Sequence, residues 1–134
     1  MKTKMTEEEI KKYLSEKWKE RNKLCSRAKK LWDKAHKLYG QGLKIRKKAD
    51  KPKEELNKLY VNHSKLPAGG EKLVIQRYKI DSEATLIYAE ANKLYAKGGI
   101  LWAQGDGIYI DAVIKIYGPK AIIDWEDGSV KSGQ

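Results

Sequence analysis

Residues 84–98 read ATLIYAEANKLYAKG and repeat a seven-residue unit: a small residue, an Ile or Leu three positions later, then a Tyr. With the small position labelled a, the aliphatic position is d and the aromatic position is e. The unit continues toward the C-terminus, where the small residues are Gly98, Gly105 and Ala112. A sustained period of seven predicts helices that wind around each other with a left-handed supercoil.

The same unit occurs in the first half of the chain. Its small positions there are Ala28, Ala35, Gly42 and Ala49, followed at d by Leu31, Leu38 and Ile45 and at e by Trp32, Tyr39 and Arg46. Small residues at a let two helix backbones approach closely, so the pattern predicts a tightly packed antiparallel pair. The aromatic stripe at e is expected to widen this core. The alternative is that a surface-facing Trp18 or Trp32 offers a platform on which nucleobases stack.

Helix start and stop signals divide the chain into five segments. Thr6 and Glu9 form a capping box, and Gly118-Pro119 ends the last helical pattern. We therefore expect a basic long helix at 6–50, a short helix at 52–64, a loop at 65–70, an apolar long helix at 71–117 and a β-hairpin at 120–131. The predicted fold is mainly α: one domain, 1–134, built as a long antiparallel helical hairpin with a short connecting helix and a small C-terminal β-hairpin.

The net charge of +11 over 134 residues belongs to the first half of the chain. Residues 1–65 hold 21 Lys and Arg and nine Asp and Glu, and residues 66–134 hold eight and nine. The single cysteine excludes an internal disulfide framework and fits a reducing compartment. Without a long apolar run or a signal peptide, the chain is expected to be soluble, cytoplasmic and without a membrane partner.

Basic residues recur at positions c and g of the first long helix. The predicted anion-binding residues are Lys23, Arg27, Lys30, Lys34, Lys37, Lys44 and Lys48. A cationic row of this kind suits a nucleic acid, a nucleotide or an acidic protein. The alternative is that these lysines only solvate the outside of a bundle while their stems shield the seam.

The second long helix is apolar nearly all round, which predicts burial on more than one side. One partner helix cannot cover it, so we expect a homo-oligomeric bundle with this helix central and the lysine-rich helix outside. The predicted oligomer interface consists of Leu94, Leu101, Trp102, Ile108, Tyr109 and Ile110. The glycines at 98–99 and 105–107 indicate either close helix contact in the core or a local opening that admits a ligand.

Catalytic chemistry has little basis in the sequence. His36 and His63 lack metal-ligand spacing, and Cys25 at an e position is expected to be a small buried hydrophobe rather than a nucleophile. The paired glycines lack the Walker pattern and a preceding strand. We expect no enzyme, no metal and no cofactor.

Four segments resemble a group of small proteins of tailed bacteriophages and prophages. They are NKLYAKG at 92–98, LWAQGD at 101–106, DAVIKIYG at 111–118 and IIDW at 122–125. Those proteins carry KLxAEG or LWAEA heptads ahead of a valine-rich helix end, a Gly and a Trp-containing strand; Lys97 and Gln104 stand here where Glu is common. The resemblance implies a phage accessory protein without assigned catalytic residues, acting in an infected or lysogenic host. With the basic helix, it suggests a binding protein that interferes with a host defence process. The alternative is a structural or assembly protein whose hairpin only mediates self-association.

Overall fold

The computed structural model describes residues 5–62 and 69–132, and these are mainly helical, as predicted. The elements in chain order are α1 (Glu7–Lys47), α2 (Asp50–Asn62), α3 (Gly70–Tyr117), β1 (Ile122–Ile123) and β2 (Val130–Lys131). No helix among the described residues is long and apolar enough to cross a membrane.

The start of α1 is the predicted capping box. The Glu9 amide donates to Thr6 Oγ1 at 3.1 Å, and the Thr6 amide donates to Glu9 Oε1 at 3.3 Å. These reciprocal bonds satisfy two amides that the helix itself leaves unpaired. At its other end α1 stops at Lys47, three residues before the predicted end, and α2 starts at Asp50 after a two-residue turn.

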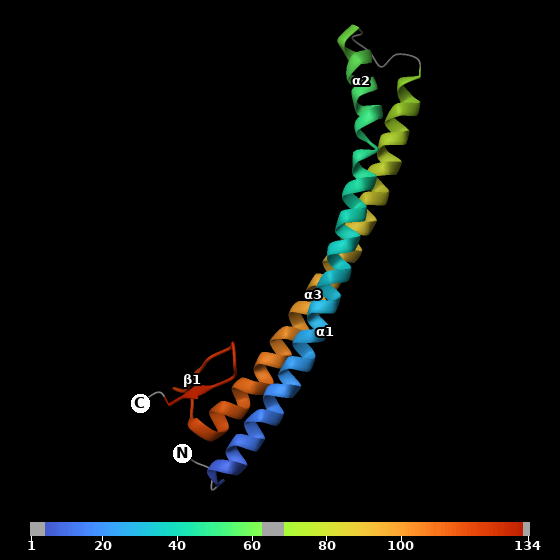
Figure 1. The fold of residues 1–134 in the computed structure, drawn as a ribbon. Coiled ribbons are helices and arrows are strands. Elements are labelled where there is room, and N and C mark those ends of the chain that lie inside the picture. The colour runs from blue at the N-terminus through green and yellow to red at the C-terminus, as the bar shows by residue number, and fades with distance from the viewer. Residues whose placement is uncertain (1–4, 63–68, 133–134) are drawn as a thin grey trace. The chain divides into compact units, whose positions relative to one another are not determined.

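Contacts group the chain into two compact units. The terminal unit comprises Met1–Leu31 and Ala96–Gln134, and the middle unit comprises Trp32–Tyr95. Within each unit, a part of α1 and a part of α3 lie side by side and antiparallel (Figure 1). The predicted pairing of two long helices is therefore confirmed within each unit.

The small a positions form the most deeply buried line in both units. Ala28 and Ala112 are buried in the terminal unit, and Ala35, Ala84 and Ala91 are buried in the middle unit. The Ile and Leu side chains at d are half-buried beside them. This is the arrangement that small residues at a permit, because close backbones leave the larger d side chains at the flanks.

The helix α3 runs unbroken through all four of its predicted weak points, so the glycines do not open it. Gly105 has a packing reason: a Cβ there would lie 3.0 Å from the Arg21 carbonyl oxygen and 3.3 Å from the Leu24 Cβ. A Cβ at Gly99 or Gly107 would meet nothing within 4 Å. Close helix contact therefore accounts for Gly105.

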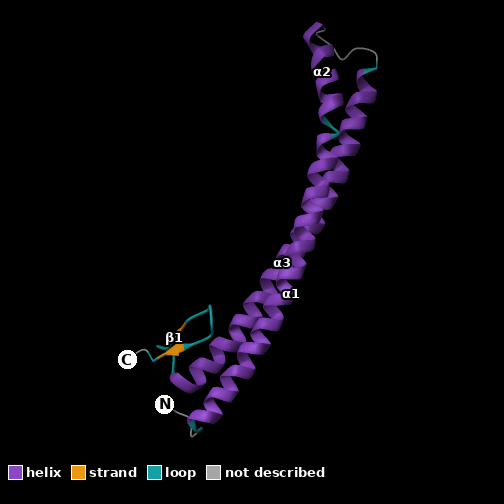
Figure 2. Cartoon of the chain, in the orientation of Figure 1, coloured by secondary structure: helices purple, strands orange, loops and turns teal. Residues whose placement is uncertain are grey.

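The C-terminal hairpin packs on the helices of the terminal unit. Gly118, with a φ of +88°, ends α3, and β1 and β2 pair antiparallel with Ile123 opposite Val130 (Figure 2). The Tyr109 hydroxyl donates to the Gly128 carbonyl, and a Cβ at Gly128 would lie 2.6 Å from the Trp18 ring. These contacts give a two-stranded hairpin the support that it needs in water.

Candidate functional site

The helix α1 carries most of the chain's net positive charge. This helix holds 14 Lys and Arg and six Asp and Glu, whereas α3 holds six of each. All seven predicted anion-binding residues are exposed. Because they occupy positions c and g of the heptad, they lie away from the a positions that face α3.

In the terminal unit, Lys23, Arg27 and Lys30 follow one another on this face at spacings of four and three residues. Together with Lys19, Asn22 and Ser26 they line a shallow hollow of about 560 Å³. Every lining side chain comes from α1, and none is acidic. The side chains that line the hollow therefore carry positive charge and no negative charge.

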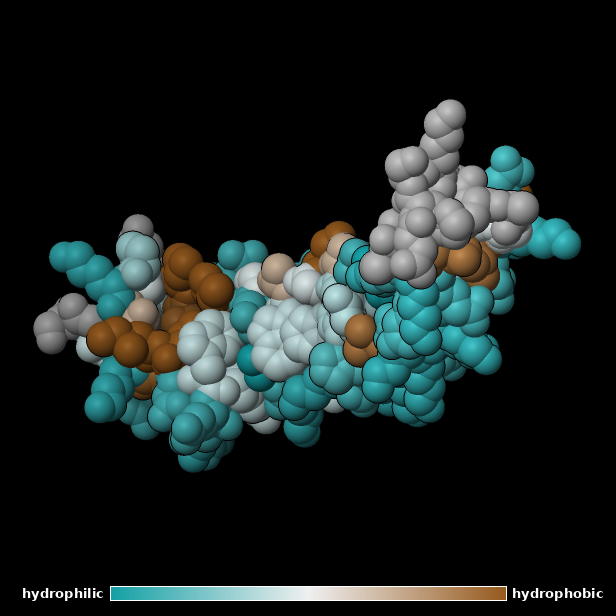
Figure 3. Space-filling model, turned by 90° about the horizontal axis from the view of Figure 1, so that it is seen from above, coloured by the Kyte–Doolittle hydropathy of each residue, from teal (hydrophilic) through white to brown (hydrophobic). Residues whose placement is uncertain are grey.

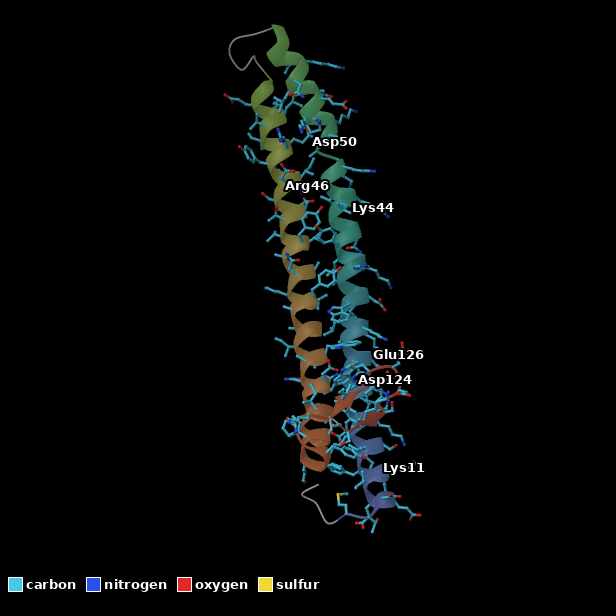
Figure 4. The ribbon with its side chains drawn as sticks, turned by 90° about the vertical axis from the view of Figure 1, so that its left-hand side faces the viewer. Lys11, Lys44, Arg46, Asp50, Asp124 and Glu126 are labelled. Atoms are coloured by element: carbon cyan, nitrogen blue, oxygen red, sulfur yellow. The ribbon has the colours of Figure 1, made fainter. Side chains whose placement is uncertain are left out.

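In the middle unit, Lys34, Lys37, Lys44 and Lys48 continue the same heptad positions. Lys44 lies on the side of α1 turned away from α3, whereas Arg46 lies toward α3 (Figure 4). The Arg46 guanidinium stands 5.9 Å from the centre of the Tyr88 ring. Arg46 therefore belongs to the seam and Lys44 to the outer face.

Few carboxylates balance these cations. Among the described residues, the ion pairs made by α1 side chains are Lys17 with Glu20 and Arg21 with Asp106. None of the seven predicted residues takes part in either pair. We refer to these seven residues, Lys23, Arg27, Lys30, Lys34, Lys37, Lys44 and Lys48, as the cationic row.

A second charged cluster is buried, and the sequence analysis did not single it out. Arg21 occupies an a position and is 9% exposed. Its Nε donates to Asp106 Oδ1 at 3.0 Å, and its Nη1 donates to Asn22 Oδ1 at 3.0 Å. The guanidinium carbon lies 4.7, 5.2 and 5.3 Å from the ring centres of Trp18, Trp125 and Trp102.

This cluster joins α1, α3 and the C-terminal hairpin. A buried guanidinium is costly unless it is paired, and here a carboxylate and three indole faces surround it. Its Nε and Nη1 already have partners within the chain and its side chain is buried, so Arg21 serves packing rather than ligand capture. The sequence signal for this cluster was an arginine at position a, where the repeat otherwise has small or apolar residues.

A hollow of about 590 Å³ lies beside the hairpin in the same unit. Its apolar lining includes Ile10, Leu14, Trp18, Tyr109 and Val130. Burial raises the pKa of the Tyr109 hydroxyl, which keeps the proton that it donates to Gly128. Nothing in this lining resembles a catalytic constellation.

Cys25 and His36, which the sequence offered as candidates for catalysis or metal binding, are buried and hydrogen-bonded, respectively. Cys25 is 4% exposed, and burial raises the pKa of its thiol, which disfavours the nucleophilic thiolate. His36 Nδ1 shares a hydrogen bond with the Tyr95 hydroxyl. His63 lies outside the described residues. Within 5–62 and 69–132, no group of three or more His, Cys, Asp or Glu side chains is placed to hold a metal.

The predicted oligomer interface is largely engaged inside the chain. Leu94, Leu101, Trp102 and Ile108 are half-buried, and Tyr109, 2% exposed, stacks edge-on against Trp18 with ring centres 4.9 Å apart. Ile110 alone of the six is exposed. Of these six residues, only Ile110 therefore lies on the outward face of α3.

Comparison with known proteins finds no matching family model, no matching curated protein and no matching solved structure. The phage resemblance of residues 84–126 stays a prediction.

Proposed function

We propose that this protein is a non-enzymatic binding protein whose α1 holds a linear polyanion, the phosphate backbone of a nucleic acid, along its outer face. The observation that carries the proposal is the cationic row, whose seven side chains are exposed and unpaired within the described part of the chain. Exposed cations that form no ion pair with a carboxylate remain available to an external anion.

The spacing of the row favours a polymer over a small anion. Within the terminal unit its members stand four and three residues apart, and in the middle unit Lys34 and Lys37 stand three apart, which is about 4.5 to 6 Å along the helix axis. A nucleotide needs donors that converge on one point, whereas these side chains are spread along a convex helix. One strand of DNA carries a phosphate about every 3.4 Å along the axis, a density that such a row can follow.

Aromatic side chains near the row favour contact with phosphates rather than with bases. The Trp32 indole donates to the Tyr95 carbonyl at 3.2 Å, and Trp18 packs against Tyr109 and Trp125. Neither ring offers a free platform for stacking. We therefore expect binding that depends on charge and little on base sequence.

The test is a titration of fluorescent DNA and RNA oligonucleotides with the wild type and with the Lys30→Gln, Lys37→Gln, Lys44→Gln triple variant. The triple variant should bind at least about tenfold more weakly, because it loses three phosphate contacts. Lys72→Gln, Lys79→Gln, Lys120→Gln is the matched control: it changes the net charge equally at exposed lysines outside α1. Equal losses in both triples would overturn the assignment to α1, and preferential binding of polyglutamate would point to an acidic protein partner.

A structural role is the second candidate, and the exposed apolar face of α3 favours it. The hairpin would then act as a self-associating spacer, with the cationic row serving only solubility. Absence of any polyanion binding, together with stable self-association, would decide for this role. A phage setting and interference with a host defence process remain part of the first proposal and rest on the sequence resemblance alone.

A further inference from the structure

The face of α3 that points away from α1 carries an uncovered apolar stripe in the terminal unit. Its members occupy positions c and f, and they are Ala96, Ile100, Ala103, Ile110, Ile114 and Tyr117. All six are exposed, Ile100 to 58%. Positions c and f lie about 140° to 160° around the helix from position a, so the stripe is on the opposite side from the seam with α1.

The stripe has the spacing of a second helix-packing seam. Its residues, with Gly107 completing the row, alternate at intervals of four and three from 96 to 117. That interval is the a/d spacing of a heptad repeat, and it extends over about 32 Å of helix. Residues of high hydropathy are visible in patches on the surface of the molecule (Figure 3). Monomeric proteins seldom leave a continuous apolar row of this length in water.

We propose that a second copy of this chain docks on the stripe, with its α3 antiparallel to the first. The charges beside the stripe select this occupant. Lys97 and Asp111 lie on one edge, both at position g, and both are exposed without an ion pair in the described structure. They stand 14 residues apart, so a two-fold axis near Gln104 places Lys97 of each copy beside Asp111 of the other.

The parallel orientation lacks this complementarity. In parallel pairs the two edges of the seam face each other, so Lys97 and Asp111, which lie on the same edge, do not meet. Residues at the same edge position, such as Lys97 and Asp111 at position g, face each other only in an antiparallel pair. Charge therefore favours the antiparallel orientation.

Side-chain volumes match the same register. With Lys97 opposite Asp111, Ile100 lies opposite Ile110, and Ala96 lies opposite Ile114. At the centre Ala103 lies opposite Gly107, so the two backbones can approach closely. Ile114 then meets a small residue and Ile100 meets a matching isoleucine, which is what tight packing requires.

The dimer and the polyanion site are independent. The stripe belongs to α3, whereas six members of the cationic row belong to α1 and Lys48 belongs to the turn after it, so either can fail while the other stands.

Light scattering after size exclusion at micromolar protein tests the interface. The wild type should have the mass of a dimer, and Ile100→Glu should be a monomer with unchanged far-UV circular dichroism. Ile122→Glu is the matched control, because Ile122 is an equally exposed isoleucine of the same unit but lies on β1. It should remain a dimer. A monomeric wild type, or an Ile100→Glu variant that keeps its mass, would overturn the proposal.

Cross-linking tests the orientation in a Cys25→Ala background. Gln104→Cys should form a disulfide between copies on mild oxidation, because residue 104 lies next to its own copy at the two-fold axis. Lys97→Cys alone should not, whereas Lys97→Cys with Asp111→Cys should. Disulfides from Lys97→Cys alone, or none from Gln104→Cys, would contradict the antiparallel register.

Charge reversal is a further test of whether a second copy of the chain docks on the stripe. Lys97→Asp should raise the dissociation constant of the dimer about three- to tenfold, because two symmetric pairs are lost. Adding Asp111→Lys should restore the affinity. Equal affinities in all three proteins would remove the argument from charge and with it the proposal.

Discussion

Arg21 and Asp106 form an ion pair inside the terminal unit, with 3.0 Å between the guanidinium Nε and the carboxylate Oδ1. The Arg21 guanidinium also packs against the rings of Trp18, Trp102 and Trp125. A single polar contact thus links α1 to α3 at the place where the C-terminal hairpin also packs.

Replacing the carboxylate should destabilise this unit. Asp106→Asn keeps the size of the side chain but leaves the buried guanidinium without its counter-charge, and we expect a loss of about 1 to 3 kcal/mol in the free energy of unfolding. Urea denaturation followed by circular dichroism measures it. Glu90→Gln, which neutralises an exposed carboxylate of α3 that has no ion pair in the described structure, should stay within about 0.5 kcal/mol of the wild type.

The double variant Arg21→Met, Asp106→Asn separates charge from packing. It should recover part of the loss, because an apolar side chain needs no counter-charge in a buried site. If Asp106→Asn unfolds at the same urea concentration as the wild type, the pair has no structural role.

The closeness of the helices at Gly105 predicts an unusual response to alanine. Gly→Ala inside a helix normally stabilises by about 0.8 to 1 kcal/mol. At Gly105 the new Cβ would press on the Arg21 carbonyl oxygen, which is backbone and cannot move aside. Gly105→Ala should therefore destabilise, by about 1 to 2 kcal/mol in the same denaturation measurement.

Gly99→Ala is the control on the same helix. Its Cβ would meet nothing within 4 Å, so this variant should gain about 0.5 to 1 kcal/mol. A stabilised Gly105→Ala protein would show that the two helices do not approach as described.

Tyr88 and Tyr109 differ in whether their buried hydroxyl group has a hydrogen-bond partner. The Tyr88 hydroxyl is buried and has no hydrogen-bond partner among the described residues, whereas the Tyr109 hydroxyl donates to Gly128. Tyr88→Phe should thus leave the melting temperature unchanged or raise it, and Tyr109→Phe should cost about 1 to 2 kcal/mol. Calorimetry of the two variants measures this difference, and a reversed order would contradict both assignments.

Local chemistry made much of the fold predictable from the sequence. The capping box at Thr6 formed as expected, Gly118 ended α3, and the small residues at a became the buried seam. Each of these features depends on neighbours within one or two helical turns, or on a period that both halves share. Such information is present in a single sequence.

The outer face of α3 could not be predicted from the sequence. A period of seven marks apolar faces but does not say which face the chain's own partner helix takes. The predicted oligomer interface consisted of five d and e positions, which α3 uses within the chain, and of Ile110, which lies on the outer face. The Arg21 cluster was missed because its partners are up to 104 residues away along the chain.

The dependence of nucleic-acid affinity on salt tests the central claim most directly. Each phosphate contact contributes about 0.7 to 0.9 to the slope of log K against log salt concentration. If α1 holds the backbone, Lys30→Gln, Lys37→Gln, Lys44→Gln should lower the magnitude of that slope by about 2 to 3, and Lys72→Gln, Lys79→Gln, Lys120→Gln should leave it nearly unchanged. A slope that is the same in the wild type and the α1 variant, or affinity that does not depend on salt, would contradict the account.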